Sequence, residues 1–509
     1  MAGIKSLAKE TAVYGLSSIV GRFLNWCLVP LYVYIFRPEE YGIVSYLYSF
    51  TAVVLVILNY GMETGFFRFA NKEGADSVKV YSTSLMSVGI TSLAFILLVT
   101  VFLYPLSDLI LLSDKSLYVW LLGVTVSVDA FSNIPFAYLR FRKKAFRFAG
   151  IKLANVGLNI ALNLFFLLLC PVLTESCPGS VDWFYAPAGG VEFGIGWIFV
   201  ANIISTLVVL LLLLPQIMDA RFHLDCRLLR SMLRYSWPLL VLGVAGIMSQ
   251  NMGQIVIPYL FRGEEDAARA MVGIYGANIK IAIVMVMFTQ AFRYAYEPFI
   301  FAQARNRGED QKQMYADAMK FFVIFGLFIF LCVMFFLPVL KHFVAPDYWS
   351  GLSVVPVMMM AELFFGVFFN LSLWYKLTDK TVWGMYFSLI GFVLMLMLNI
   401  LLVPAIGIPS GYMGSAWAAF ISYFVIMTLS WYAGRKYYPV PYEWAGMGFY
   451  LLLAAILWGV SWSVADSPIW LSCPVRIVLL FVYLMAVAIR ENVPILTPLV
   501  RKFLRHRGL

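Results

Sequence analysis

The sequence predicts an all-α polytopic membrane protein of about 14 transmembrane helices, and three observations support this prediction. Of the 509 residues, 62% are hydrophobic and only 13% are charged, which is more apolar surface than a soluble chain can bury. The apolar residues gather in runs of about 20, the length of helix that crosses the hydrocarbon core of a bilayer. Basic residues gather in alternate loops between these runs.

Fourteen apolar runs are long enough to form these helices. In chain order, the predicted spans are roughly residues 11–36, 41–62, 81–104, 117–138, 149–170, 193–215, 236–261, 272–292, 318–340, 353–375, 383–403, 412–433, 446–465 and 474–490.

The distribution of lysine and arginine predicts the orientation of the spans. With the N-terminus inside, most basic residues fall in inside loops, and the outside loops hold only Arg37, Lys115, Arg262, Arg269, Lys341 and Arg476. Because basic residues favour the cytoplasmic side, both termini are predicted to be cytoplasmic and the number of spans to be even. The net charge of +10 then reflects topology and contacts with membrane lipids, and no nucleic acid is expected as a partner.

The stretch from Thr11 to Glu40, which contains the first span, holds an arginine near its middle. Arg22 shares one helix face with Ser18, Gly21 and Asn25. A guanidinium at membrane depth costs several kcal/mol unless it faces water, a partner or an anionic ligand. The span is therefore predicted to line a polar cavity. The alternatives are an arginine that reaches the cytoplasmic interface or pairs with an acid.

Five short sequence matches recur in the same order in the two halves of the chain. They include Val29-Pro30 with Ile257-Pro258, and Phe67 to Ala70 with Phe292 to Ala295. Spans 1–6 and 7–12 are therefore predicted to be two copies of one bundle, related by a pseudo-two-fold axis along the membrane normal, with a ligand site between them. The predicted parts are an N-terminal lobe (1–215), a C-terminal lobe (216–433) and an appendage with spans 13 and 14 and a basic tail (434–509).

Several other spans carry polar residues at helical spacing. Span five has a continuous stripe of Lys152, Asn155, Asn159 and Asn163, and span seven has Gly246, Gln250 and Gln254 in steps of four. Asn and Gln between membrane helices often serve only to hold the helices together, and this alternative stays open for each of them.

Charged residues within other spans indicate an anionic ligand. Lys280 lies deep in span eight, so that Arg22 and Lys280 place one cation in each lobe, and arginine suits phosphate because its planar fork makes two parallel hydrogen bonds. Asp129 in span four and Glu362 in span ten either pair with these cations or are the protonatable groups that couple transport to a cation gradient.

The first span has the form G-x6-R-x7-P (Gly15, Arg22 and Pro30) and is followed by FRPEEYG (36–42). Together with fourteen spans in two six-helix lobes and an appendage, this pattern resembles the polysaccharide transporter branch of the multidrug/oligosaccharidyl-lipid/polysaccharide (MOP) superfamily, the Wzx-type O-antigen flippases. The resemblance covers nearly the whole chain and implies a MATE-like fold.

The resemblance also implies a function. It is the movement of an undecaprenyl-pyrophosphate-linked oligosaccharide, a repeat unit of O-antigen, capsule or exopolysaccharide, across the bacterial inner membrane by alternating access. Such a transporter is not an enzyme and needs no cofactor, although an H⁺ or Na⁺ gradient is expected to drive it. The implied partners are the lipid-linked glycan, membrane lipids and the polysaccharide assembly machinery.

In a related flippase of the superfamily, cations lie on spans one, two and eight. Arg22 and Lys280 match the first and third of these, while span two has no basic residue between Tyr41 and Met62. Arg22 and Lys280 are therefore expected to bind the diphosphate. The other expected substrate-binding residues are Lys152, Asn25, Asn155, Asn159, Asn163, Gln250 and Gln254.

Two other functions stay open. A MATE-like exporter of drugs or metabolites would favour deep acids in the N-terminal lobe and a chain of about 12 spans. A membrane glycan polymerase or ligase would act on the same lipid carrier but usually needs a large external loop, and the longest one here runs only from Pro171 to Glu192.

Other chemistry has little support in the sequence. There is no GxxxxGK[ST] phosphate loop, so the chain carries no P-loop ATPase of its own. The three histidines and six cysteines are scattered without metal-ligand spacing, and no metal site is expected. Cys170 and Cys177 flank the longest outside loop, and a disulfide between them is left open.

Overall fold

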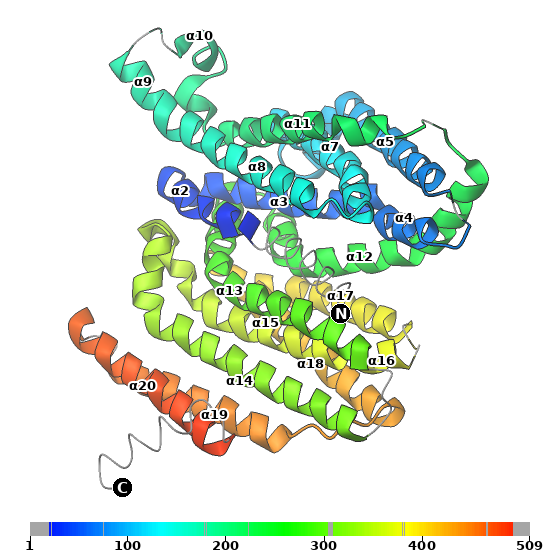
Figure 1. Cartoon of the computed structure of the whole chain (residues 1–509). Coiled ribbons are helices and arrows are strands. Elements are labelled where there is room, and N and C mark those ends of the chain that lie inside the picture. The colour runs from blue at the N-terminus through cyan, green and yellow to red at the C-terminus, as the bar shows by residue number, and fades with distance from the viewer. Residues whose placement is uncertain are drawn as a thin grey trace. The chain divides into compact units, whose positions relative to one another are not determined.

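The structure is a computed structural model, and the residues it describes are 20–21, 23–74, 76–177, 179, 181–221, 223–303, 309–378, 380, 382–464 and 467–491. Within these ranges the regular structure is helical throughout (Figure 1).

The helices of the first half are α2 (Leu28–Ile35), α3 (Pro38–Asn59), α4 (Met62–Ala70), α5 (Ser77–Val101), α6 (Leu103–Leu109), α7 (Ser116–Phe141), α8 (Ala145–Leu164), α9 (Cys170–Ser176), α10 (Asp182–Tyr185) and α11 (Gly196–Met218). Those of the second half are α12 (Cys226–Leu260), α13 (Glu265–Gln303), α14 (Glu309–Leu340), α15 (Val354–Leu371), α16 (Leu373–Leu377), α17 (Val382–Ile406), α18 (Tyr412–Tyr437), α19 (Trp444–Ser461) and α20 (Ile469–Arg490).

The helices account for every predicted span. Among the described residues, 13 helical segments are long and apolar enough to cross a membrane, and the shorter apolar helix Phe23–Ile35 falls in the first predicted span. The predicted all-α polytopic fold is therefore confirmed, and the chain is a multi-pass membrane protein.

The ends of α3 follow from local sequence. Pro38 suits the first helical position because its missing N–H has no partner to lose there, and the Glu40 carboxylate accepts a hydrogen bond from the Arg37 N–H at 3.0 Å. At the other end, Tyr60 (φ 31°) and Gly61 (φ 70°) adopt left-handed conformations, which stop the helix and turn the chain into α4.

Helix α12 begins ten residues before the predicted span because Asp225 caps it. The Asp225 carboxylate accepts hydrogen bonds from the Arg227 and Leu228 N–H groups and forms an ion pair with Lys79 at 2.6 Å. The bond from Lys79 and the two from the backbone lower the pKa of Asp225 to about 2. A polar first turn thus extends the helix beyond its apolar run.

The described chain forms two compact units. One contains the residues up to Gly276 together with Met395–Ser415, and the other contains Ala277–Leu394 and the residues from Ala416 onward. Helices α13, α17 and α18 pass from one unit to the other. The units are defined by contacts and the predicted lobes by a sequence repeat, so the lobe boundaries stay a prediction.

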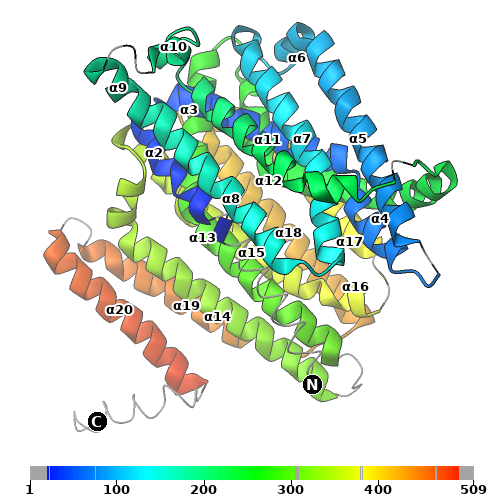
Figure 2. The same cartoon turned by 45° about the horizontal axis from the view of Figure 1, so that its top comes forward.

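In the first unit, α7 is central. It packs against α3, α5 and α11, while α11 also packs against α8, and α12 packs against α3 and α4. Figure 2 shows α7, α11 and α8 running beside one another. This arrangement brings the polar faces of α3, α8 and α11 together.

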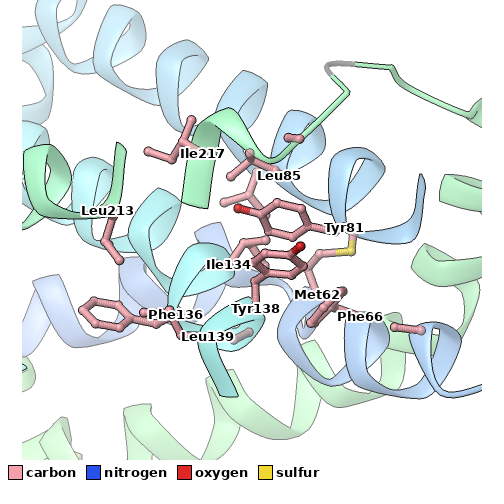
Figure 3. Close-up of a cluster of buried hydrophobic side chains, with 14 of the residues drawn as sticks. Met62, Phe66, Tyr81, Leu85, Ile134, Phe136, Tyr138, Leu139, Leu213 and Ile217 are labelled. Carbon is pink, nitrogen blue, oxygen red and sulfur yellow. The ribbon is translucent and has the colours of Figure 1, made fainter. Parts of the chain in front are cut away.

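A buried cluster holds one end of the first unit together (Figure 3). The Tyr81 and Tyr138 rings stack with their centroids 4.0 Å apart, and the Tyr81 hydroxyl donates to the backbone carbonyl of Gln216 at 2.8 Å. Met62 and Phe66 of α4 pack beside them and are fully buried. The cluster therefore holds α4, α5, α7 and α11 together by apolar packing alone.

In the second unit, α14 packs against α15 and also against the last two helices, α19 and α20. Figure 1 shows α19 and α20 lying along α14. The predicted appendage of spans 13 and 14 is thus attached to one helix of this unit.

Candidate functional site

The predicted stripe of span five lies along α8 and is increasingly buried toward one end. Lys152 and Asn155 are half-buried, Asn159 is buried, and Asn163 is fully buried. Their spacing of three to four residues places all four on one side of the helix. The stripe therefore has an accessible end at Lys152 and an enclosed end at Asn163.

The enclosed end is a hydrogen-bond network. The Asn163 amide donates to the carbonyl (2.8 Å) and to Oδ1 (3.1 Å) of Asn159, and its own Oδ1 accepts from the Tyr32 hydroxyl at 3.0 Å. The Asn159 amide donates to Oδ1 of Asn202 at 2.7 Å and to Oγ of Ser205 at 3.3 Å. The network joins α2, α8 and α11 inside the first unit.

The network also reaches α3, because the Asn202 amide donates to the Tyr48 hydroxyl. A buried amide that loses its partner costs about 1–3 kcal/mol. A sugar would have to replace these bonds at Asn159 and Asn163, so in this structure the two side chains hold helices together. Their predicted contact with a glycan stays a prediction.

The accessible end of the stripe is charged. The Lys152 ammonium lies over the Phe136 ring, 4.2 Å from its centroid, and its charge acts on Asp129 of α7. The Asp129 carboxylate also accepts a hydrogen bond from Thr206 of α11 at 3.2 Å. Asp129 therefore has a cation and a donor within the first unit. Arg22, the other partner considered for it, lies outside the described residues.

Two further predicted residues of the first unit are exposed. They are Asn25, next to α2, and Gln250 on α12. An amide exposed on a helix that spans a membrane needs water or a polar ligand, because hydrocarbon offers it no hydrogen bond. Asn25 and Gln250 are therefore suited to line a hydrated path.

Gln254, one turn along α12 from Gln250, is buried and bonded. Its side-chain oxygen, Oε1, accepts a hydrogen bond from the Ser49 hydroxyl of α3. Like Asn159 and Asn163, Gln254 is used within the protein, and its role with substrate stays a prediction.

Helices α3 and α13 approach each other at glycines near their N-terminal ends. A Cβ atom on Gly42 would lie 1.9 Å from the carbonyl oxygen of Arg269, and one on Gly273 would lie 2.0 Å from that of Pro38. A Cβ on Gly276 would lie 2.5 Å from the Ser45 hydroxyl oxygen. Only residues without a side chain allow backbones to meet this closely, as at small-residue contacts between membrane helices.

An ion pair lies at the same end of α13. Arg269 donates to the Asp114 carboxylate at 3.0 Å and is also near Glu265 at 3.6 Å. In the predicted orientation this end is outside. The first unit is therefore closed between α3 and α13 at its predicted outer end.

The second unit contains the other predicted charged residues. Lys280 on α13 and Glu362 on α15 are both half-buried. Among the described residues, Glu362 has no ion-pair or hydrogen-bond partner. Arg22, a cation considered as its partner, lies outside the described residues, so the pairing of Glu362 with Arg22 stays a prediction.

Glu362 shares its helix face with unsatisfied polar atoms. Asn370 is buried, and neither atom of its amide has a hydrogen-bond partner among the described residues; the same holds for the Thr289 hydroxyl of α13. Gly366, between Glu362 and Asn370, packs so that its Cβ would lie 2.9 Å from the Thr289 oxygen. Oxygen atoms of the kind that bind small cations are thus present at Thr289 and Asn370, and the Glu362 carboxyl of the same helix face can also take up a proton.

In the described part of the chain, no group of His, Cys, Asp and Glu side chains is arranged to hold a metal. Cys170 is buried and Cys177 is exposed, and no disulfide joins them in the described structure, so the pairing left open from the sequence is not formed.

A family model described as "Polysaccharide biosynthesis protein" matches residues 7–302, more than half of the chain. The chain belongs to the polysaccharide biosynthesis protein family. No curated protein matches it.

Several solved structures share the fold. This polysaccharide biosynthesis protein is similar to the lipid II flippase MurJ in an inward closed conformation, with a TM-score of 0.70 and 13% identity over 96% of this chain and 100% of that one. It is also similar to an inward-facing MATE family transporter of the MOP superfamily, with a TM-score of 0.61 and 16% identity over 82% and 94% of the two chains. The MATE multidrug transporter DinF-BH gives a TM-score of 0.58 and 16% identity over 84% and 96% of the two chains.

At these identities the likeness shows the fold, and it confirms the predicted MATE-like architecture. The family match agrees with the resemblance expected from the first span and the lobes.

The polysaccharide biosynthesis protein contains a charged cluster that sequence reasoning missed. Lys320 of α14 is buried and forms ion pairs with Glu491 at 2.7 Å and Glu443 at 3.1 Å, and the Tyr450 hydroxyl donates to Glu491 at 2.8 Å. The sequence places Lys320 among the inside basic residues. No local pattern points to acids that follow it by more than a hundred residues.

The sequence places Arg476 on the outside, at the start of the predicted span 474–490, and the structure starts this helix five residues earlier, at Ile469. Arg476 lies within α20, is 5% exposed, and donates to the carbonyl of Phe335 on α14 at 3.0 Å. The run of apolar residues that starts at Trp470 is the signal for the longer helix. Both Lys320 and Arg476 bind α14 to the C-terminal helices.

Proposed function

We propose that this protein is a flippase of the bacterial inner membrane, with both termini in the cytoplasm, that moves a polyprenyl-pyrophosphate-linked oligosaccharide to the outer leaflet by alternating access. The observation that carries the proposal is the polar face of the first unit. Asn25 and Gln250 are exposed and Lys152 and Asn155 half-buried on helices that are otherwise apolar. A hydrated path for a polar head group, beside lipid for its tail, accounts for these residues.

The residues divide into two groups in this proposal. Arg22 and Lys280 bind the diphosphate, with Lys152 as a further cation, and Asn25, Asn155 and Gln250 meet sugar hydroxyls. Asn159, Asn163 and Gln254 stabilise the walls through the bonds they already make. The substrate brings its own negative charge, and transport requires no enzyme chemistry.

The driving ion is proposed to act at the acids. Glu362 shares a face of α15 with Gly366 and Asn370, and Thr289 of α13 lies beside Gly366. The polar atoms of Asn370 and Thr289 have no partners among the described residues, and the charge of Lys152 acts on Asp129. Binding and release of H⁺ or Na⁺ at either acid would change the charge of its surroundings as the protein changes conformation. The polysaccharide assembly machinery is the expected protein partner.

A leaflet-resolved assay of a lipid-linked oligosaccharide in proteoliposomes tests the proposal. The wild type is compared with Arg22→Ala, Lys280→Ala and Lys152→Ala, with and without an H⁺ or Na⁺ gradient. Lys72→Ala, in the exposed turn after α4, is the control. We expect at least tenfold slower translocation in the first two variants, an intermediate loss in the third, and none in the control.

Efflux of organic cations without lipid translocation would instead favour a drug exporter, the function suggested by acids such as Asp129 in the first unit. A changed glycan chain length would indicate a polymerase or ligase.

A further inference from the structure

A cavity of about 170 Å³ lies in the first unit between α3, α5, α6 and α7. Its lining is Leu47, Phe50, Thr51 and Val54 of α3, Phe95 and Val99 of α5, Leu106 and Ile110 within and beside α6, and Val119, Leu122, Gly123 and Val126 of α7. None of the residues assigned to the polar site lines it.

The cavity offers water nothing to bind. Eleven of its twelve lining residues are apolar, and the one hydroxyl, that of Thr51, donates to the carbonyl of Leu47 in its own helix at 2.9 Å. A buried water usually needs two to four polar partners, and apolar cavities of about 150 Å³ stay dry but bind small hydrocarbons. The chemistry of the lining therefore selects a hydrocarbon.

Two features of the sequence keep the cavity open. Gly123 has no side chain to fill it, and a Cβ there would lie 2.9 Å from Cγ1 of Val99. Helix α5 also ends at Val101, and α6 begins again at Leu103 after a break at Phe102. After this break, Leu106 of α6 lines the cavity.

The cavity is partly open to the surface of the unit. Phe50, Val54 and Phe95 of its lining are only half-buried. Ile57, one turn beyond Val54 on the same face of α3, is 47% exposed. In a membrane, exposed apolar residues on spanning helices touch lipid chains, so a chain that meets Ile57 also meets the mouth of the cavity.

The depth of the cavity suits the interior of the bilayer. Leu47 to Val54 lie about 14–24 Å along α3 from its first residue, at 1.5 Å per residue. This falls inside a hydrocarbon core of about 30 Å and away from the head groups. Ile110 and Val119 extend the lining toward the predicted outer end, so the cavity is within reach of the acyl chain of a lipid in the outer leaflet.

We propose that the end of a phospholipid acyl chain from the surrounding bilayer occupies this cavity. The chain enters past Phe50 and Val54 and packs against Val99 and Gly123. It supports α3 on the side opposite Ser45 and Ser49, which face α13 and α12. Bilayer lipid is thus a structural component of the first unit, whatever substrate the protein carries.

The test uses full-length protein in vesicles of a phosphatidylcholine whose acyl chain carries a photoreactive diazirine near its end. Irradiation is followed by peptide mapping of the attached lipid. Two variants change the cavity in opposite directions: Val54→Phe fills it, and Leu122→Ala enlarges it. Ile57→Phe, on the same face of α3 but outside the lining, is the matched control.

We expect labelling at α3, α5 and α7 that falls at least fivefold in Val54→Phe, rises or is kept in Leu122→Ala, and is unchanged in Ile57→Phe. In detergent without lipid, Val54→Phe should also unfold at a higher temperature than the wild type, because the ring replaces the missing chain. Added phospholipid should then stabilise Val54→Phe less than it stabilises the wild type.

Equal labelling of the wild type and Val54→Phe would overturn the proposal. So would a cavity labelled by a photoreactive polyprenyl phosphate but not by the phospholipid, which would assign it to the carrier lipid. Because the readouts are labelling and thermal unfolding, they do not depend on transport, and failure of the flippase proposal would leave them unaffected.

Discussion

The four polar residues of α8 share one helix face but differ in how firmly the protein holds them. Asn159 and Asn163 each make at least two side-chain hydrogen bonds and are buried. Asn155 makes no side-chain hydrogen bond among the described residues and is half-buried. The first pair stabilises the fold, while Asn155 is available to a ligand at little cost.

This difference predicts opposite effects of two alanine substitutions. Asn159→Ala leaves Asn202 and Ser205 with fewer partners and should destabilise the protein by about 1–3 kcal/mol. Asn155→Ala should leave the thermal midpoint within about 1 °C and slow translocation several-fold, since surface changes rarely exceed about 0.5 kcal/mol. Thermal unfolding in detergent and the leaflet assay, run on both variants, check this. Equal loss of stability in the two would contradict the division.

Glu491 makes the stability of the protein depend on pH. Burial raises the pKa of its carboxyl, but the hydrogen bonds from Lys320 and Tyr450 outweigh this and leave the pKa below its ordinary value of 4.5. The folded state thus binds the proton more weakly than the unfolded state. The contribution of Glu491 to stability is present above pH 4.5 and is lost as the pH falls through the lowered pKa.

We therefore expect the unfolding temperature of the wild type to fall between about pH 5 and pH 3, and to fall less steeply in Glu491→Gln. At about pH 7 the variant should be less stable than the wild type, because it loses the charged bond to Lys320. Thermal unfolding across this pH range measures both effects. Parallel curves for the two proteins would show that Glu491 is not the group responsible.

At the scale of single residues, the sequence predicts the spacing of polar side chains along a helix well, and it predicts their hydrogen-bond and ion-pair partners poorly. The stripe on α8 follows from the helical period alone. That Asn163 meets Tyr32, and Asn159 meets Asn202, depends on how three helices pack, and no short-range pattern contains this. The acids that pair with Lys320 lie far along the chain, so the sequence alone suggests only that this lysine marks the inside. The bond from Arg476 to the Phe335 carbonyl likewise depends on the packing of α20 against α14.

Among the elements, the contact between α3 and α13 is the tightest described. Gly42 and Gly273 each face a backbone carbonyl of the other helix, so a methyl group at either position has no space. The contact depends on backbone approach rather than on side-chain packing. Its disruption should separate the helices without first opening the core of Figure 3.

Gly42→Ala is therefore expected to force α3 and α13 apart at the predicted outer end. In a background without the six native cysteines, a Cys at position 45 should react with a membrane-impermeant maleimide at least fivefold faster when Gly42→Ala is present. Gly157→Ala on α8, where a Cβ meets nothing within 4 Å, is the matched control. Unchanged reactivity with Gly42→Ala would mean that the helices absorb the methyl group locally.

The sequence predicts the existence of each helix better than its ends. Apolar length marks the part in the membrane, but α12 continues into a polar turn because Asp225 caps it and Lys79 pairs with that cap. Helix α3 ends as its local signals indicate, at Tyr60 and Gly61. A helix end that is set by residues adjacent in the chain can be predicted from sequence. A helix end that is stabilised by a residue of another helix, as Asp225 is by Lys79, cannot.

For the whole molecule, alternating access requires that the closed end of the first unit open during each cycle. A Cβ on Gly276 would lie 3.0 Å from Cβ of Ser45, about half an ångström below the range found in disulfides. A small outward shift of the helices therefore allows a disulfide between Ser45→Cys and Gly276→Cys, which would hold α3 to α13. We expect the oxidised double variant to lose at least nine-tenths of translocation and to regain it on reduction. Each single variant is the control, and transport by the oxidised protein would exclude this opening.

The fold of the whole molecule is predictable because composition, span length and basic loops all point to the same architecture, and the family and fold comparisons agree with it. The site is predictable only as a set of helix faces. Which polar groups are exposed and which are used in packing depends on contacts between distant helices, as Gln250 and Gln254 show on a single helix.

The ion pairs of Lys320 with Glu443 and Glu491 can form only late in the synthesis of the chain. Lys320 is synthesised 123 residues before Glu443, and Glu491 comes later still. Until α19 and α20 have left the ribosome, Lys320 has only Asp317, 4.0 Å away, and its two closer acids do not yet exist. The last two helices therefore complete the ion pairs of an earlier one. A chain that stops after α18 would remain a recognisably unfinished product for the quality-control machinery of the membrane.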